Sequence, residues 1–589
     1  MTYTENKSPT FLTTGNPCLD IFFHVVPNTP ATILKEHLRS AWNHEPLTTL
    51  KLIFNLRGVR GTGKSDMDGF YTAAHWLHQN HPKTLAANVG SIPGFGYFKD
   101  LPEILYQLVQ GPDVRRNQKD ERIKAKYNIK EAKEKIHISQ DRWRLLVPRE
   151  TRVLEMEKRD REEKKPEASR LRKIKRLEMA RKAMDKYSDD PNYQFLFERI
   201  SDYFAERLKN DMKFYESGEF RKVSLAAKWC PSLDYSYDRV TLICESIAKN
   251  VFPREMYPEY EGIKEAHYAY RVRNRLRKQV LVPLRKVLEF PEVYIGANRW
   301  DLIPYDRVAS VAMSLYKDKF FKHDHARFTK YLDEVKAEKI KINAGALLPH
   351  LMVKSSLNRR GGYGGQVAEL QWKRMIDDLS KEGKLRNCMA VCDVSGSMKG
   401  TPMKVVVALG ILVSELSEDP WKGKLITFSE TPELQNVQGD DLKSKAKFLR
   451  FMNWGFNTDF QKLSDRILEV AVERNLKPEQ MIKRLFVFSD MEFDQASMIP
   501  WETDYQAIMR KFTEKGYGLV VPEIAFWNLR HSISTPVTRK QKGVALLSGF
   551  SKNLIKLFLN NDGDIDISPE MVMEAAISGE EYQKLVVVD

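Results

Sequence analysis

Five oxygen-bearing side chains in the last third of the sequence have the types and spacing of a divalent-metal site. Asp393, Ser395 and Ser397 form a D-x-S-x-S pattern directly after CMAVC, an apolar segment typical of a buried strand. Thr458 and Asp490 follow at longer intervals, and Asp490 ends a second apolar segment, RLFVFS. Carboxylate and hydroxyl oxygens suit Mg²⁺, or Mn²⁺ in its place. The absence of Cys and His from the set argues against zinc.

Alternating strands and helices are predicted to position these side chains. After Gln366, short apolar segments alternate with helical ones; the segments are CMAVCDV, KLITFS, RLFVFSD, VPEIAFWNL and VALLSG. This alternation predicts a mostly parallel, doubly wound α/β sheet, and such sheets bind ligands outside the carboxyl ends of their strands. The helix after Pro402 is apolar nearly all round, as expected of a central helix pressed on the sheet.

The five residues resemble the metal-ion-dependent adhesion site of von Willebrand A domains, and the likeness covers about residues 385–589. It implies that Ser395, Ser397 and Thr458 supply hydroxyl oxygens, and that Asp393 and Asp490 act partly through water. It also implies an open coordination position that accepts a carboxylate from a protein partner. The alternative is a cluster of helix caps and turns that holds no metal.

The sequence before this domain is predicted to be mainly helical, because apolar residues recur at spacings of three and four. We expect antiparallel helix pairs stacked in a HEAT-like array. A charged insertion with 26 Lys or Arg and 17 Asp or Glu divides this array. The alternating charges of this insertion predict an exposed helix, which is either only solvated or contacts nucleic acid. The predicted parts are a flexible tail (1–15), helical repeats (16–112), the charged insertion (113–190), further helical repeats (191–357), a Gly-rich hinge at Gly361–Gly365 with a lead-in helix (358–384), and the α/β domain (385–589).

The helical part is similar to the module of the Ro and telomerase-associated proteins in the segments LKLIFNLRGVRGTGK, SLAAKWCPS and KINAGALLPH. In Ro autoantigen this module also precedes a von Willebrand A domain. The whole chain is more similar to an uncharacterised plant family with the same layout, also found in fungi and large DNA viruses. MAVCDVSGSM, WGFNTDFQKL, FVFSDMEFD and GFSKNLIKLF carry that resemblance. The resemblance to the Ro-type module implies RNA binding by the helical region, and the charged insertion is a departure from that module.

The run Gly58–Ser65 satisfies the P-loop pattern G-x-x-x-x-G-K-S. A P-loop needs a buried strand before it and a helix after it, within a βαβ core. The surroundings are helical on both sides, so we expect an accidental match. Arg57, Arg60 and Lys64 then remain candidate phosphate contacts for a nucleic acid.

Bulk properties limit the classes of function. The net charge of +16 favours contact with nucleic acid or an acidic surface. Five cysteines without zinc-finger spacing indicate reduced thiols and a cytoplasmic or nuclear location. No signal peptide and no apolar run of about 20 residues is found, so we expect no membrane span.

We expect no enzyme, because Ser395 lies in V-S-G-S rather than in the hydrolase pattern G-x-S-x-G. The sequence predicts a scaffold that binds a protein through Mg²⁺, with RNA as a further partner of the helical region. The alternatives are a pure protein adaptor without RNA and a nucleotide-dependent enzyme that uses Lys64.

Overall fold

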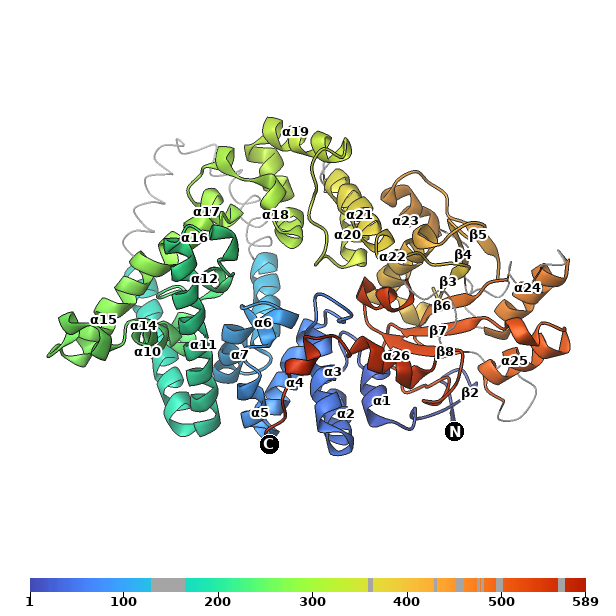
Figure 1. The fold of residues 1–589 in the computed structure, drawn as a ribbon, viewed down its shortest axis with the longest axis horizontal. Helices are drawn as coiled ribbons and strands as arrows, with labels where there is room; N and C mark the ends of the chain where they lie inside the picture. The colour runs from blue at the N-terminus through green and yellow to red at the C-terminus, as the bar shows by residue number, and fades with distance from the viewer. Residues whose placement is uncertain are drawn as a thin grey trace, which may run out of the picture. The chain divides into compact units, whose positions relative to one another are not determined.

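The chain combines an N-terminal helical region with a C-terminal α/β domain that is built on a mostly parallel sheet (Figure 1). The computed structural model describes residues 1–128, 165–358, 364–427, 432–451, 460–473, 477, 481–493, 502–559 and 567–589. Thr458 therefore lies outside the described residues, as do residues 361–363 of the predicted hinge. Gly364 and Gly365, which were also assigned to the hinge, instead begin a helix.

Two compact units make up the described chain, and they do not follow the predicted domain boundaries. Unit 1 comprises Met1–Ala73, Gly94–Gly96 and Glu289–Val587, and unit 2 comprises Ala74–Pro93, Tyr97–Leu288 and Val588–Asp589. Residues 16–73 and 289–357, which were predicted to belong to a separate helical array, thus form one compact unit with the sheet. The HEAT-like arrangement itself stays a prediction.

The sheet of unit 1 has the strand order β5-β4-β3-β6-β7-β8 (Figure 1). All neighbours pair in parallel except the edge strand β5, which is antiparallel to β4. The strands are β3 (Cys388–Cys392), β4 (Lys424–Thr427), β5 (Leu434–Asn436), β6 (Arg484–Ser489), β7 (Glu523–Asn528) and β8 (Val544–Ser548). The five predicted strands are confirmed. The short β5 was not predicted, because three partly exposed residues carry no apolar signal.

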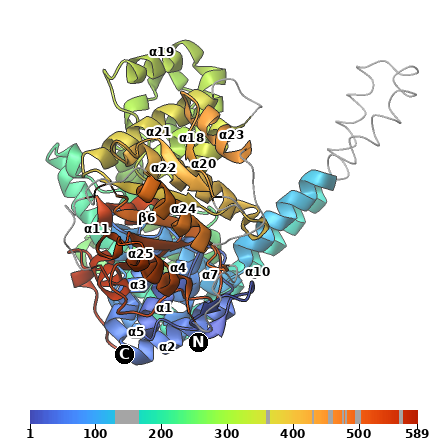
Figure 2. The ribbon, with the colours of Figure 1, turned by 90° about the vertical axis from the view of Figure 1, so that its right-hand side faces the viewer.

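The two faces of the sheet are covered by different helices, since side chains alternate along each strand. Val391 shares a core with Ile467 of α24 and Ile508 of α25, two helices that lie side by side (Figure 2). Cys392 points to the other face, where a Cβ on Gly410 of α22 would lie 2.5 Å from its Sγ atom. The glycine therefore lets α22 pack closely on β3, and α22 is buried nearly all round as predicted.

The other helices of unit 1 come from both ends of the chain. A second core joins α18, α19 and α21 around Phe320 and Phe328. The helices of unit 1 are α1 (Pro17–His24), α2 (Ala31–His44), α3 (Pro46–Arg57), α17 (Pro291–Gly296), α18 (Ser310–His323), α19 (His325–Lys336), α20 (Pro349–Ser356), α21 (Gly364–Ser380), α22 (Thr401–Leu416), α23 (Leu442–Phe451), α24 (Phe460–Glu473), α25 (Asp504–Glu514) and α26 (Pro569–Ala576). α4 (Met67–Asn80) and α6 (Ile92–Phe95) contribute residues to both units.

The N-terminal residues, predicted to be a flexible tail, are instead attached to the α/β domain. β1 (Thr2–Tyr3) and β2 (Pro9–Thr10) pair with each other, and Phe11 forms a bridge with Thr535. The Thr4 hydroxyl donates to the Phe493 carbonyl at 2.7 Å, in the loop that follows β6. The prediction of a tail was wrong because the segment is polar, and its polar groups are satisfied by hydrogen bonds that composition does not reveal.

Helix α1 is held against the sheet by a buried lysine. Asn16 caps the helix by accepting from the backbone of Cys18 at 2.9 Å, and Phe23 enters the core of the sheet. The Lys64 ammonium donates to the carbonyl oxygens of Phe22 (2.5 Å) and Val25 (3.2 Å) and to the Ser548 hydroxyl (2.7 Å) at the end of β8. Lys64 thus connects α1 to the sheet.

Unit 2 is helical and is organised around α11 (Pro191–Glu216). Apolar side chains of this helix, including Tyr193, Ile200 and Phe204, are buried at helical spacing, and α11 packs on α14. Further helices of unit 2 are α5 (Pro82–Ala87), α7 (Asp100–Gln110), α10 (Lys165–Asp189), α12 (Ala226–Trp229), α13 (Asp238–Thr241), α14 (Ile243–Val251), α15 (Glu265–Arg275), a π-helix (Leu276–Leu281) and α16 (Val282–Val287). Residues 114–128 are also helical. None of the helices described in either unit is long and apolar enough to cross a membrane.

Replacing Lys64 by alanine is expected to lower the free energy of unfolding by about 2 to 3 kcal/mol. The Ser548 hydroxyl lies 2.8 Å from the Phe22 carbonyl and 3.0 Å from the Val25 carbonyl, but it can donate to only one of them, so the other buried oxygen loses its donor. Urea denaturation of the full chain measures this as a lower midpoint. Arg39→Ala, on the exposed surface of α2, is the control and should leave the midpoint unchanged. Equal midpoints for Lys64→Ala and the parent chain would contradict the role of Lys64 in holding α1.

Candidate metal centre

The candidate residues lie at the topological switch point of the sheet. From β3 the chain moves outward to β4 and β5, and it then returns to the other side of β3 as β6. Such a reversal opens a crevice at the carboxyl ends of the two central strands, where α/β sheets bind ligands. Asp393 directly follows β3 and Asp490 directly follows β6, and Cys392 pairs with Phe488 in the register. Both carboxylates therefore reach the same edge, as the sequence predicted.

Asp393 is fully buried and held in one orientation by two hydrogen bonds. Its Oδ1 atom accepts from the backbone nitrogen of Ser395 at 2.9 Å. Its Oδ2 atom accepts from the hydroxyl of Ser489 at 2.6 Å. The same hydroxyl accepts from the backbone of Met491 at 3.1 Å, so Ser489 also supports the turn that leads away from Asp490.

The two serines of the D-x-S-x-S pattern form a hydroxyl pair in the turn after β3. Ser395 Oγ and Ser397 Oγ lie 2.9 Å apart. Gly396–Met398 form a single 3-10 turn, so both serines fall within one short loop before α22. Ser395 is 8 % exposed, whereas Ser397 is exposed, which places the hydroxyl pair at the mouth of the crevice.

One carboxylate oxygen of Asp490 is buried without a hydrogen bond from the described residues. The residue is 2 % exposed, and its Oδ2 atom accepts no hydrogen bond within the part of the chain that the structure describes. Among the described residues, Arg530 forms an ion pair with that oxygen, from which its Nη1 lies 3.9 Å. Arg530 also donates to the carbonyl of Ser397 at 2.9 Å. Buried acceptors are nearly always satisfied in folded proteins, so this oxygen is available to water or to a ligand.

The charge of Asp490 acts on the neighbouring carboxylate of Asp393. Burial, followed by the negative charge of Asp490, raises the pKa of Asp393 from 3.8 to about 6. Both effects disfavour the ionised form, because a second negative charge is placed in a region with little water. A bound cation would oppose both effects. Three features of these residues fit a divalent metal. One oxygen of Asp490 accepts no hydrogen bond from the described residues, the carboxylates of Asp393 and Asp490 repel each other, and two serine hydroxyls lie beside them.

The candidate ligands include only two ionisable side chains, Asp393 and Asp490, and the other candidate ligands are hydroxyls. Among the described residues, no three or more His, Cys, Asp or Glu side chains gather in a way that could hold a metal ion. The candidate centre instead combines two carboxylates with hydroxyls, as hard cations prefer. Thr458, the fifth predicted ligand, lies outside the described residues.

Two side chains of the candidate site were missed by the sequence interpretation. Ser489 orients Asp393, and Arg530 approaches Asp490 and Ser397 from the end of β7. Each could have been found by considering all polar residues at the carboxyl ends of the predicted strands. Ser489 is the last residue of β6, and Arg530 lies two residues beyond the end of β7.

The candidate phosphate contacts are corrected by the structure. Arg57 and Lys64 are 4 % and 2 % exposed, so neither can meet a phosphate backbone in the folded chain. Arg60 is exposed, but its guanidinium donates to the carbonyls of Gly94 (3.2 Å) and Gly96 (3.4 Å). Gly58–Ser65 follows helix α3 rather than a strand, so the P-loop pattern is an accidental match, as expected.

Comparison with known proteins places the chain in a family. Residues 4–385 match the family described as a domain of unknown function, DUF2828, and residues 387–586 match a second one, DUF7788. The chain belongs to the DUF2828 family.

Two further similarities of this DUF2828 chain were found. It is 28 % identical over 581 residues to an uncharacterized protein, L728, of Acanthamoeba polyphaga mimivirus, which covers 95 % of the chain and 85 % of that protein. The crystal structure of the Deinococcus radiodurans Ro (RSR) protein aligns with a TM-score of 0.28 and 13 % identity, covering 68 % of the chain and 91 % of that protein.

Asp393→Asn is expected to stabilise the chain in EDTA by up to about 3 kcal/mol near pH 7.5, because the variant removes one of two repelling charges. The folded pKa of about 6 lies above the ordinary 3.8, so the parent chain loses stability as the pH rises between these values. The difference should therefore shrink as the pH falls and vanish below about pH 4. Urea denaturation across this range measures it.

The matched control for this measurement is Asp440→Asn, because Asp440 is exposed and lies outside the cluster. It should change the free energy of unfolding little at any pH. If Asp393→Asn were less stable than the parent chain in EDTA, the hydrogen bonds to Asp393 would outweigh the repulsion, and the electrostatic description would be wrong.

Proposed function

We propose that this chain is a non-enzymatic adaptor that holds Mg²⁺ or Mn²⁺ at the carboxyl ends of β3 and β6 and binds a protein partner there. The observation that carries the proposal is the buried Oδ2 atom of Asp490, which accepts no hydrogen bond from the described residues and lies 3.9 Å from Arg530. It lies beside the electrostatically disfavoured carboxylate of Asp393. Asp393, Ser395, Ser397 and Asp490 would hold the cation, with Thr458 as a fifth ligand. When bound, such a cation supplies an open coordination position that accepts a carboxylate from the partner.

The strand order supports a von Willebrand A-like domain. Numbered along the chain from β3, the strands of the sheet follow the doubly wound order 3-2-1-4-5-6 with an antiparallel edge strand. The candidate residues follow the two strands that flank the switch point, which agrees with the resemblance of the sequence motif. The likeness of the helical region to the Ro-type module and to the plant family rests on the sequence segments alone.

The side chains around the candidate centre support the proposal of a binding site. Ser489 and the backbone of Ser395 fix the carboxylate of Asp393, and the hydroxyl pair lies at the mouth of the crevice. The positive charge of Arg530 beside Asp490 would help to attract an acidic group of a partner. In this proposal these groups orient and attract a ligand and do not catalyse a reaction.

Calorimetric titration of the EDTA-treated full chain with Mg²⁺ tests the proposal. We expect the parent chain to bind Mg²⁺, and Asp393→Ala to weaken binding about a hundredfold or more, which corresponds to about 2.7 kcal/mol. Ser397→Ala should weaken it less, because one neutral ligand can be replaced by water. Asp440→Ala, an exposed carboxylate outside the cluster, is the matched control. Equal Mg²⁺ affinity in the parent chain and Asp393→Ala would refute the assignment.

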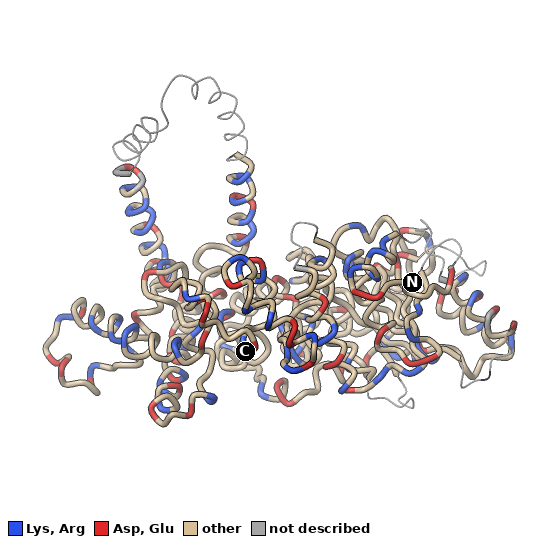
Figure 3. Tube along the Cα trace, turned by 90° about the horizontal axis from the view of Figure 1, so that it is seen from above, with Lys and Arg blue, Asp and Glu red and all other residues tan. Residues whose placement is uncertain are grey.

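RNA binding is a second candidate function, and the charge of α10 favours it. The helix contains nine Lys or Arg and four Asp or Glu, and residues 169–178 are all exposed. Figure 3 shows the basic residues as blue bands on the two helices that flank the undescribed residues 129–164. Arg172, Lys173 and Arg176 make no ion pair with any residue that the structure describes. Such a surface is suited to the phosphates of a nucleic acid.

Replacing Arg172, Lys173 and Arg176 by glutamine is expected to weaken the binding of a single-stranded RNA oligonucleotide. The slope of log K against log salt should fall by about 2, since each phosphate contact contributes about 0.7 for a single strand. Fluorescence anisotropy at several salt concentrations measures both effects. The control replaces the exposed Lys319, Lys322 and Lys330 of unit 1 by glutamine. An unchanged slope in the α10 variant would exclude this helix as the RNA contact.

A further inference from the structure

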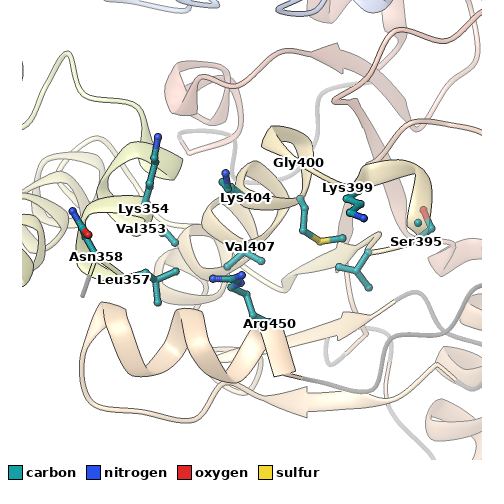
Figure 4. Close-up of a pocket in the computed structure, with 13 residues that line it drawn as sticks. Val353, Lys354, Leu357, Asn358, Ser395, Lys399, Gly400, Lys404, Val407 and Arg450 are labelled. Carbon is teal, nitrogen blue, oxygen red and sulfur yellow. The ribbon is translucent and has the colours of Figure 1, made fainter. Parts of the chain in front are cut away.

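A pocket with a volume of about 630 Å³ adjoins the candidate metal centre (Figure 4). It lies between the end of α20, the start of α22 and Arg450 of α23, and Ser395 and Gly396 form one of its walls. A pocket of this size is in the range that binds drug-sized ligands or a few side chains of a peptide. Because Ser395 belongs to both sites, a ligand at the candidate centre can continue into the pocket.

The pocket combines an apolar floor with a cationic rim. Its apolar lining residues are Val353, Leu357, Val394, Met403 and Val407. Its charged lining residues are Lys354, Lys399, Lys404 and Arg450, and no acidic side chain lines it among the residues that the structure describes. Figure 4 shows Lys354 on α20, Lys399 in the turn before α22, Lys404 in the first turn of α22, and Arg450 reaching toward Val407. Four cations around an apolar floor select a ligand with carboxylates beside an apolar group.

Three of the rim cations are lysines whose charges are not neutralised by the described part of the chain. Lys354, Lys399 and Lys404 are exposed and form no ion pair with the described residues. The first turn of α22 contains no acidic residue, and Gly400 provides no side-chain cap. The positive end of the helix dipole therefore adds to the lysines.

A buried histidine nearby responds to the same field. Burial, and then the positive charges of Lys404 and Lys354, lower the pKa of His350 from 6.5 to about 4. His350 is 6 % exposed and packs edge-on against Phe550. The influence of both lysines on this ring agrees with a positive potential around α20 and α22.

We propose that this pocket binds a short acidic peptide segment of the partner protein, with an apolar side chain on the floor and flanking carboxylates on the cationic rim. The proposal rests on the proposed function, because it extends the contact of the same partner from the candidate centre. The peptide is favoured over a separate small ligand because the pocket is continuous with Ser395. From the cationic rim and the apolar floor we expect the partner's segment to contain a large apolar residue with acidic residues on either side.

Selection from a phage-displayed library of random dodecapeptides on the full-length chain in Mg²⁺ tests the proposal. The expected peptides combine at least two acidic residues with a large apolar residue. Labelled copies of the enriched peptide are then measured by fluorescence anisotropy. Lys399→Glu combined with Lys404→Glu is expected to weaken binding about tenfold or more, since like charges then face the ligand.

The matched control is Lys443→Glu combined with Lys447→Glu. These lysines are exposed on α23 and do not line the pocket, so the change in net charge is the same. Selection of peptides without acidic residues, selection of none, or equal weakening by both double variants would overturn the proposal. Stronger competition by an RNA oligonucleotide than by the unlabelled peptide would also overturn it, because the rim would then be an RNA site.

Repeating the measurement in EDTA and with Asp393→Ala separates this proposal from the proposed function. Binding that needs the rim lysines but neither Mg²⁺ nor Asp393 would support the pocket and contradict the metal-dependent adaptor. Binding that needs Mg²⁺ and Asp393 but not the rim lysines would support the adaptor and contradict the peptide pocket. Dependence on both is the expected result.

Discussion

Two carboxylates that share a site with little water place the strongest constraint on this protein. Asp393 and Asp490 follow adjacent strands, both are nearly inaccessible to solvent, and the charge of Asp490 disfavours that of Asp393. The neighbouring groups stabilise these two buried carboxylates only in part. Ser489 and the turn at Ser395 satisfy Asp393, while one oxygen of Asp490 has only Arg530 nearby. A bound cation would satisfy both carboxylates, and this is the basis of the proposed metal site.

The rest of unit 1 keeps this edge in place. Gly410 lets α22 pack closely on β3, and the N-terminal hairpin is bonded to the loop that follows Asp490. Lys64 connects α1 to the end of β8. Residues from the DUF2828 region therefore help to build the unit that contains the DUF7788 sheet. The two family regions are separate in the sequence, but residues from both regions form the compact unit 1.

The sequence predicted the parts of the structure that depend on local patterns. Apolar strands, the apolar helix α22 and the carboxylates at strand ends each leave a signal within a few residues. The N-terminal attachment, the burial of Lys64 and the division into two units depend on contacts between residues hundreds of positions apart. Lys64 shows the difference, because a basic residue in a glycine-rich loop suggests a phosphate contact until its three buried acceptors are known.

The most direct test of the metal centre is anomalous diffraction from crystals of the full chain grown with Mn²⁺. The account predicts a strong manganese peak within bonding distance of side-chain oxygens at the carboxyl ends of β3 and β6, between Asp393 and Asp490. It also predicts loss of this peak in crystals of Asp393→Ala. An ordered edge without a peak in the parent chain, with Arg530 paired directly to Asp490, would contradict the account and leave this cluster as a structural ion pair.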